Sequence, residues 1–153
     1  KDKLNYYIPV VFLVLIFIQI SIGAFVSGMD AGKIYNTWPL MDNNYFPDDN
    51  KFVNLFYLSA FSDPSLVQFM HRNLAYLILF FYFFILFKVY QNKKKDFFNI
   101  VKLIGVILFI QIGLGIFTLI YGAQIFLSSM HQISSIFLVS SSVYFYYLNS
   151  RSN

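Results

Sequence analysis

Long uncharged stretches divide this chain into three apolar blocks. Residues 6–28 carry no charge, residues 64–87 carry only Arg72, and residues 103–150 carry none. A helix that crosses lipid needs about 20 mostly apolar residues. A single helix over residues 103–150 would be roughly 72 Å long, so this block must fold back, and the glycine-containing polar spot at residues 121–124 is the place to do so. The pattern predicts four membrane-spanning helices at about 6–28, 64–88, 100–121 and 125–148.

The composition supports the same class of protein. Hydrophobic residues make up 58% of the 153 residues and charged residues 12%, against roughly 25% charged in soluble domains. This excludes intrinsic disorder and argues against a water-soluble domain. The absence of cysteine excludes disulfide scaffolds and cysteine-ligated zinc or iron–sulfur sites. We therefore expect an all-α integral membrane protein, a single four-transmembrane-helix bundle over residues 1–153.

The charges predict the orientation of these helices. The net charge of +4 is unevenly distributed, and we read it as a membrane signal and not as a nucleic-acid surface. Three positive residues fall at one set of helix ends: Lys33, Lys51 and Arg72. Eight fall at the other set, which is expected to face the cytoplasm or matrix together with both termini: Lys1, Lys3, Lys88, Lys93, Lys94, Lys95, Lys102 and Arg151.

A long loop at residues 29–63 is expected between the first two helices, on the outer side. It contains the only tryptophan, Trp38, and several other aromatic residues. Such residues favour the membrane–water interface, so part of this loop is expected to lie flat on the membrane. Its adjacent carboxylates, Asp48 and Asp49, are expected to be simply solvated.

An internal repeat relates the two halves of the chain. Residues 19–25 and 111–117 share the pattern Q-I-x-[IL]-G-x-F, and Met-His follows in the next helix both times, at His71 and His131. The chain therefore reads as two helical hairpins of one kind. These are its only two histidines.

The two histidines are expected at matching depth on two helices that run in the same direction. With Asp63 as N-cap and Pro64 as first helical residue, His71 lies seven residues into its helix, and His131 lies six or seven residues into the last one. Ionisable groups inside a membrane are functional candidates. One alternative is a hydrogen bond from each ring to a nearby carbonyl. Metal ligation is the other, and two imidazoles suffice for haem iron, whereas zinc would need further ligands.

The neighbouring residues fit a flat macrocycle, although each also has a plainer explanation. Ala75 and Ser135, one turn after the histidines, leave room for it. Glycines at 23, 113 and 115 would let helices approach its edges, but small residues also serve ordinary helix packing in membranes. Arg72 and Lys33 are candidates to pair with the haem propionates, and interfacial snorkelling is the alternative for Arg72.

Several stretches together resemble the haem A synthase family (CtaA type). They are S-I-G-A-F-V-S-G-M-D-A-G at 21–32 with Y-N-T-W-P-L-M at 35–41, V-Q-F-M-H-R at 67–72, Q-I-G-L-G-I-F-T-L at 111–119 and S-M-H-Q at 129–132. They occur in order from about Gln19 to Gln132. The N-T-W-P-L-M segment and the H-R and H-Q positions make the resemblance specific.

The resemblance implies a fold and a function. Family members have eight transmembrane helices in two halves, and this chain resembles the second, C-terminal half, whose histidine pair holds haem b; by resemblance these ligands are His71 and His131. The catalytic site is expected in the other half, so none is assigned here, and the chain is expected to be a fragment or one part of a split protein. The family oxidises the C8 methyl of haem O to a formyl group, giving haem A for cytochrome c oxidase.

The resemblance also implies partners and a location. Haem O would be bound by the other half, and haem O synthase and cytochrome c oxidase assembly factors are expected partners, alongside membrane lipid and no nucleic acid. Self-association as a homo-oligomer is left open. The expected location is the bacterial inner membrane, with the mitochondrial inner membrane as the alternative. Two other functions stay open: a stand-alone bis-histidine membrane cytochrome, and a non-haem assembly subunit or small transporter.

Overall fold

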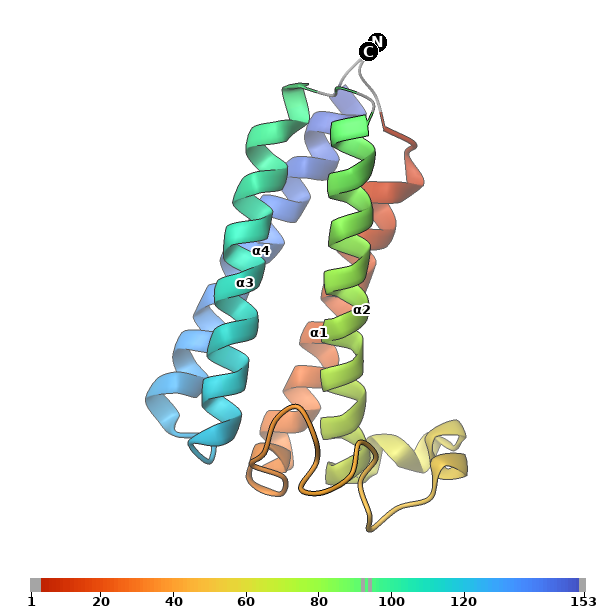
Figure 1. Ribbon diagram of the computed structural model, residues 1–153, viewed down its shortest axis with the longest axis vertical. Coiled ribbons are helices and arrows are strands. Elements are labelled where there is room, and N and C mark those ends of the chain that lie inside the picture. Colours follow the sequence, from red (N-terminus) through yellow and green to blue (C-terminus); the bar gives the residue numbers. More distant parts are fainter. Residues whose placement is uncertain (1–3, 92, 94, 152–153) are drawn as a thin grey trace.

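The computed structural model describes residues 4–91, 93 and 95–151, so Lys1, Lys3 and Lys94 of the predicted basic ends lie outside the described residues. Four α-helices run side by side along the long axis of the molecule: α1 (Tyr7–Gly28), α2 (Pro64–Gln91), α3 (Lys95–Ile120) and α4 (Ile125–Arg151) (Figure 1). We call residues 29–63, between α1 and α2, the connecting segment. It contains three short 3₁₀ helices: η1 (Ala31–Lys33), η2 (Phe52–Phe56) and η3 (Leu58–Ser62).

Local signals place the start of α2 and the turn between α3 and α4 where the sequence predicts them. Asp63 caps α2, because its Oδ1 accepts a hydrogen bond from the Leu66 amide at 3.0 Å. The chain reverses between α3 and α4 at Gly122 and Ala123, both with positive φ (67° and 57°). The Ala123 amide donates back to the Thr118 carbonyl at 2.8 Å and so closes the end of α3.

Helix α3 begins five residues earlier than predicted, at Lys95 in place of residue 100. Phe97, Val101 and Ile104 are buried on one face of this first part of the helix, so packing extends the helix beyond its uncharged span. The same reason applies to α2, which continues to Gln91 because Val89 is completely buried. The basic connection is correspondingly shorter than predicted.

Three helices, α1, α2 and α3, are long and apolar enough to cross a membrane. Helix α4 is 27 residues long, but among the described helices it does not reach the same hydropathy. Its sequence explains this difference, because eight serines lie between residues 125 and 151.

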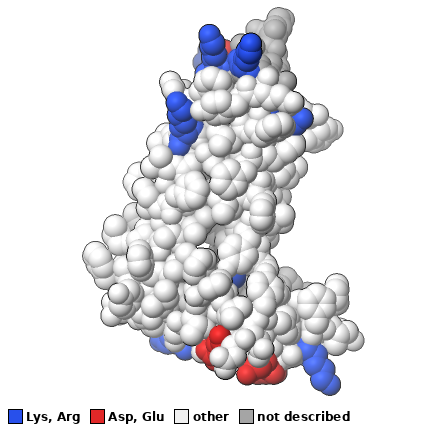
Figure 2. Space-filling view, viewed as in Figure 1, with Lys and Arg blue, Asp and Glu red and all other residues white. Residues whose placement is uncertain are grey.

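The larger apolar cluster lies at one end of the molecule, and a smaller one, formed by Tyr35, Met41 and Phe69, joins the connecting segment to α2. We call the end where α1 begins and α4 ends the terminal end, and the end that carries the connecting segment the loop end (Figure 1). Helix α1 packs against α2, α3 packs against α4, and further contacts join α1 to α4 and α2 to α3. The main buried cluster, which includes Phe12, Ile85, Phe97 and Phe145, occupies the terminal end. Figure 2 shows basic side chains gathered there, and most of the visible acidic ones at the loop end.

Candidate functional site

The imidazoles of the two histidines lie next to each other between the helix pairs. The ring centroids of His71 on α2 and His131 on α4 are 6.5 Å apart, and their planes are inclined by 79°. Both side chains are half-buried. Each ring has an Nδ1 atom that is buried and has no hydrogen-bond partner. Two imidazoles with free nitrogens in one place can hold a metal ion or a metal-containing group.

A glutamine from the neighbouring helix reaches the backbone of each histidine. Gln19 on α1 donates from Nε2 to the His71 carbonyl oxygen at 3.1 Å. Gln111 on α3 donates from Nε2 to the His131 carbonyl oxygen at 2.9 Å. Gln19 and Gln111 hold the same position in the repeated motif, so the repeat extends to the hydrogen bonds of the site.

A glycine lies against each imidazole, one turn after each glutamine. A Cβ atom at Gly23 would be 3.1 Å from Cε1 of His71, and one at Gly115 would be 3.0 Å from Cε1 of His131. Both distances are tighter than ordinary contact, so the rings lie directly on bare backbone. Gly113 has no such neighbour within 4 Å.

Helices α3 and α4 are loosely packed around His131. Among the described residues, Leu108 is the last buried residue of α3 and Leu138 is the first of α4. The parts of these two helices at the loop end, which flank His131, therefore bury no apolar side chain completely. Figure 2 shows the face in view hollowed in this half of the molecule. His131 thus lies beyond the buried apolar residues of α3 and α4.

Arg72 binds the connecting segment. Its Nη2 donates to the Tyr35 carbonyl at 2.8 Å, and its Nη1 donates to the carbonyls of Thr37 and Leu40 at 2.9 and 3.1 Å. Gln68, one turn earlier on α2, donates to the same Tyr35 carbonyl. Of the guanidinium nitrogens, Nε is buried and without a partner. Arg72 is therefore occupied mainly in holding the segment next to His71.

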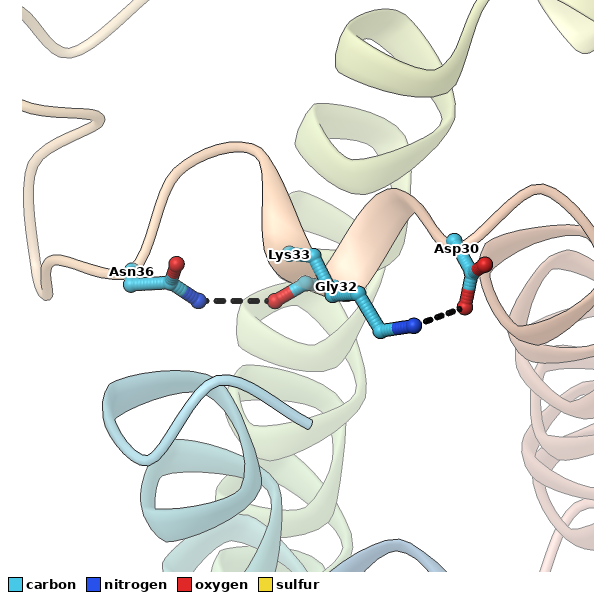
Figure 3. A network of polar contacts seen from close by, with 4 residues as sticks. All are labelled: Asp30, Gly32, Lys33 and Asn36. Carbon is cyan, nitrogen blue, oxygen red and sulfur yellow. Dashed lines mark hydrogen bonds and ion pairs between the residues drawn. The ribbon is translucent and has the colours of Figure 1, made fainter. Parts of the chain in front are cut away.

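Lys33 lies at the edge of the site. Its Nζ forms an ion pair with Asp30 at 2.8 Å, and its side chain is 56% exposed (Figure 3). Asn36, three residues on, donates from Nδ2 to the carbonyls of Gly32 and Leu119, both at 2.8 Å. The first of these bonds is drawn in Figure 3, and the second ties the connecting segment to the end of α3.

Asp48 and Asp49 are not simply solvated, which corrects the sequence prediction. Asp48 accepts a 2.7 Å hydrogen bond from the Tyr35 hydroxyl, and Asp49 accepts a 2.6 Å bond from the Ser65 hydroxyl at the start of α2. Burial, followed by the bond to Asp48, raises the pKa of Tyr35. Although burial acts to raise the pKa of Asp49, hydrogen bonds led by that from Ser65 outweigh it and hold this pKa below the usual range.

Sequence reasoning missed four polar residues of the site. Gln19 and Gln111 stood in the repeated motif, which was recognised only as a repeat. Ser134 reaches the site, because its hydroxyl lies within hydrogen-bonding distance of Gln111 Oε1 and of the His131 carbonyl. Asn36 lay within the N-T-W-P-L-M segment. The signal for the two glutamines was available, since each lies one turn from a glycine in an otherwise apolar helix.

Comparison with known proteins gives a consistent result. The family model described as "Cytochrome oxidase assembly protein" matches residues 2–143. A heme A synthase of Pelagibacter ubique is 43% identical over 152 residues, covering 97% of this chain and 45% of the relative. Those of Wolbachia pipientis and Rickettsia africae are 43% and 32% identical, covering 92% and 96% of the chain but 38% and 44% of the relatives. The chain thus spans less than half of these relatives. No solved structure matches it.

Proposed function

This chain belongs to the family of cytochrome oxidase assembly proteins, and on that premise we propose that it is the haem-binding, C-terminal half of a haem A synthase. The whole enzyme would oxidise the C8 methyl of haem O to a formyl group and so supply haem A to cytochrome c oxidase. The other half would bind haem O and carry the reacting site. This chain, the C-terminal half, would hold a second haem, haem b.

We propose His71 and His131 as the axial ligands of this haem. The observation that carries the proposal is the 6.5 Å separation of their ring centroids. Bonds from a metal to an imidazole nitrogen are about 2 Å long, so two imidazoles on opposite sides of one iron have centroids about 6 Å apart. The separation in this structure fits that arrangement.

The surroundings of the two rings also fit a bound macrocycle. The buried Nδ1 atoms without partners indicate that the protein alone does not satisfy these rings. Helices α3 and α4 bury no apolar side chain completely beside His131, and the contacts at Gly23 and Gly115 keep side chains away from one edge of each ring. With both axial positions filled by imidazole, haem iron supplies one-electron transfer and keeps no open position for oxygen.

Arg72 and Lys33 are the proposed cations near the haem propionates. Arg72 follows His71 directly and brings a positive charge to the loop end, although its Nη atoms bind the connecting segment. Lys33 is paired with Asp30, so it would have to exchange that partner. We therefore assign Arg72 mainly to holding the segment over the site, and assign the propionate charge to Arg72 before Lys33.

The proposed setting is a membrane crossed by all four helices as two hairpins. Helix α4 would be the fourth span, because it is as long as the others and packs along α3. The basic terminal end would face the cytoplasm, which would place the histidines toward the outer leaflet. A bacterial inner membrane agrees with the bacterial relatives. The connecting segment would lie outside, over the haem.

Haem uptake tests this proposal. The full chain, purified in nanodiscs and supplied with haem, should give a Soret band and a low-spin electron paramagnetic resonance (EPR) signal. His71→Ala and His131→Ala should each lose the low-spin signal, while the neighbouring Gln132→Ala keeps it; circular dichroism checks that helix content is unchanged. Absence of haem binding by the unmodified chain, or a low-spin signal that survives both histidine substitutions, would overturn the assignment.

A second test separates binding from synthesis. The chain by itself, given haem O and a reductant, should form no haem A, because the reacting site belongs to the other half. Chromatography of the extracted haems reports the product. Formation of haem A by this chain alone would contradict the proposed division between the halves.

A further inference from the structure

The two glutamine–histidine contacts are made to a specific atom. In a helix, the carbonyl oxygen of residue i already accepts the amide of residue i+4, so Gln19 and Gln111 use the second lone pair of the two histidine carbonyls. A glutamine amide inside an apolar helix must find a partner or remain costly. Each glutamine therefore fixes the position of one histidine along the axis of the neighbouring helix.

The glycine one turn further along fixes the ring of the same histidine. Gly23 and Gly115 lie at i+4 from the glutamines, on the same helix face, and contact the Cε1 edges of His71 and His131. Each repeat therefore holds its histidine at two points. One is the backbone carbonyl and the other is the edge of the imidazole.

We infer that Gln19 and Gln111 are positioning residues that hold the two imidazoles at the separation and inclination needed to ligate one iron, and that they do so unequally. This inference rests on the proposed haem site and deepens it. Partners that orient metal-ligating side chains typically change metal affinity by about 10- to 100-fold.

The inequality comes from one residue difference between the repeats. The hydroxyl of Ser134, three residues after His131, lies within hydrogen-bonding distance of Gln111 Oε1 and of the His131 carbonyl, and donates its one hydrogen to either of them. The equivalent position after His71 is Leu74, which cannot donate, and Gln19 Oε1 is buried without a partner. Gln19 Nε2 also lies 3.3 Å from Nε2 of His71. At His131, Ser134 thus gives the Oε1 atom of Gln111 a hydrogen-bond donor. At His71, the Oε1 atom of Gln19 has no such donor.

The predicted consequence is that His131 is the firmly held ligand and His71 the one more easily displaced. Gln19→Met and Gln111→Met remove the amides while keeping side-chain length and an apolar character that a membrane helix tolerates. Gln132→Met is the matched control, because Gln132 is exposed beside His131 and the substitution keeps its backbone carbonyl, which accepts from the Ser135 hydroxyl.

The measurements are haem loss to an excess of apomyoglobin, the EPR g-values, and carbon monoxide binding to the reduced protein. Gln111→Met should lose haem about tenfold or more faster, shift the g-values and admit carbon monoxide, whereas Gln132→Met should match the unmodified chain. Gln19→Met should have a smaller effect. The inference would be overturned if Gln111→Met and Gln19→Met both matched Gln132→Met in the rate of haem loss, in the g-values and in the exclusion of carbon monoxide.

Two further substitutions test the inequality without removing a glutamine. Leu74→Ser should slow haem loss by giving Gln19 the missing donor, and Ser134→Ala should speed it. Both changes are small, so they also serve if a glutamine variant fails to fold. If both substitutions changed the rate of haem loss in the opposite direction, or not at all, the proposed difference between the two histidines would be wrong. If the unmodified chain binds no haem, both the proposed function and this inference fail. If it binds haem but the glutamine, Leu74 and Ser134 variants all behave like Gln132→Met, only the positioning role fails.

Discussion

The Nδ2 atom of Asn36 lies 2.8 Å from the carbonyl oxygen of Leu119 and joins the connecting segment to the end of α3. The same amide group also donates to Gly32. Because η1, which contains Gly32, packs against α1, α2 and α3, the Asn36 side chain adds a hydrogen bond to α3 next to the place where the connecting segment meets these helices. Hydrogen bonds to backbone carbonyls, in addition to apolar packing, therefore hold the connecting segment against the helices at the loop end.

Asn36→Ala should loosen this closure. It removes two hydrogen bonds and leaves the Leu119 carbonyl at the end of α3 with the Gly122 amide as its remaining donor, at a cost of about 1–3 kcal/mol. Amide hydrogen exchange should become faster at residues 30–36 and 119–124. Asn43→Ala, at an exposed position of the same segment, should leave exchange unchanged. Equal protection in the two variants would contradict the bridging role of Asn36.

Arg72→Lys should separate the structural role of Arg72 from its charge. Lysine keeps the positive charge, but it cannot direct two groups of donors at fixed angles to three carbonyls. We expect the connecting segment to lose about 1–3 kcal/mol of local stability, seen as faster exchange at residues 35–41, while haem content stays near normal. Loss of haem with an unchanged segment would instead assign Arg72 to the propionates alone.

Acid should loosen the connecting segment through Asp49. The pKa of Asp49 is held below its ordinary value of 3.8, because hydrogen bonds led by that from Ser65 outweigh the burial that raises it. A lowered pKa stabilises the folded state above the ordinary value, and this contribution disappears as the pH falls below 3.8 through the folded pKa. Fluorescence of Trp38, the only tryptophan, should report the change.

Asp49→Asn should show a loosened segment already at neutral pH, with a weaker response to acid. Asp42→Asn is the control, because Asp42 is exposed and its positive φ of 55° suits asparagine. An acid response of Asp49→Asn identical to that of the unmodified chain would show that another group carries it.

Gly115→Ala should disturb the histidine site, and Gly113→Ala should not. Both substitutions favour the helix by a similar amount, up to about 1 kcal/mol, so their difference isolates the contact. The new Cβ at residue 115 would lie 3.0 Å from Cε1 of His131, whereas residue 113 has open space. We expect a shifted low-spin EPR signal for Gly115→Ala alone. The same spectrum for both variants would show that the ring does not depend on this contact.

The connecting segment should touch lipid at its aromatic 3₁₀ helices. Helices η2 and η3 extend sideways from the loop end (Figure 1), and Phe56 is 77% exposed, which suits the membrane interface. With Trp38→Phe as background, Phe56→Trp should be quenched by lipids brominated near the headgroup. Phe80→Trp, at a 72% exposed position within α2, should be quenched by deeply brominated lipids. Quenching of Trp at 56 by aqueous iodide alone would contradict the membrane contact.

The helices and the histidine positions could be predicted because local properties decide them. An uncharged stretch of a given length, the Asp63 cap and the turn at Gly122 each act within a few residues. The order of these signals brings His71 and His131 to matching depth, since both follow a helix start at the same end. The repeated motif likewise predicted that α1 and α3 are equivalent. The early start of α3 was missed, because the burial of Phe97 depends on other helices.

The sequence by itself determined which segments form helices and that the repeat provides one histidine in each half. Only the tertiary structure decided the 6.5 Å separation of the rings and the hydrogen bonds that Gln111 and Ser134 make at His131. It also decided that Arg72, Asn36 and Asp49 hold the connecting segment. These contacts join residues far apart along the chain, 83 positions in the case of Asn36 and Leu119. Hydrogen bonds of this kind depend on directions and distances that local composition does not contain.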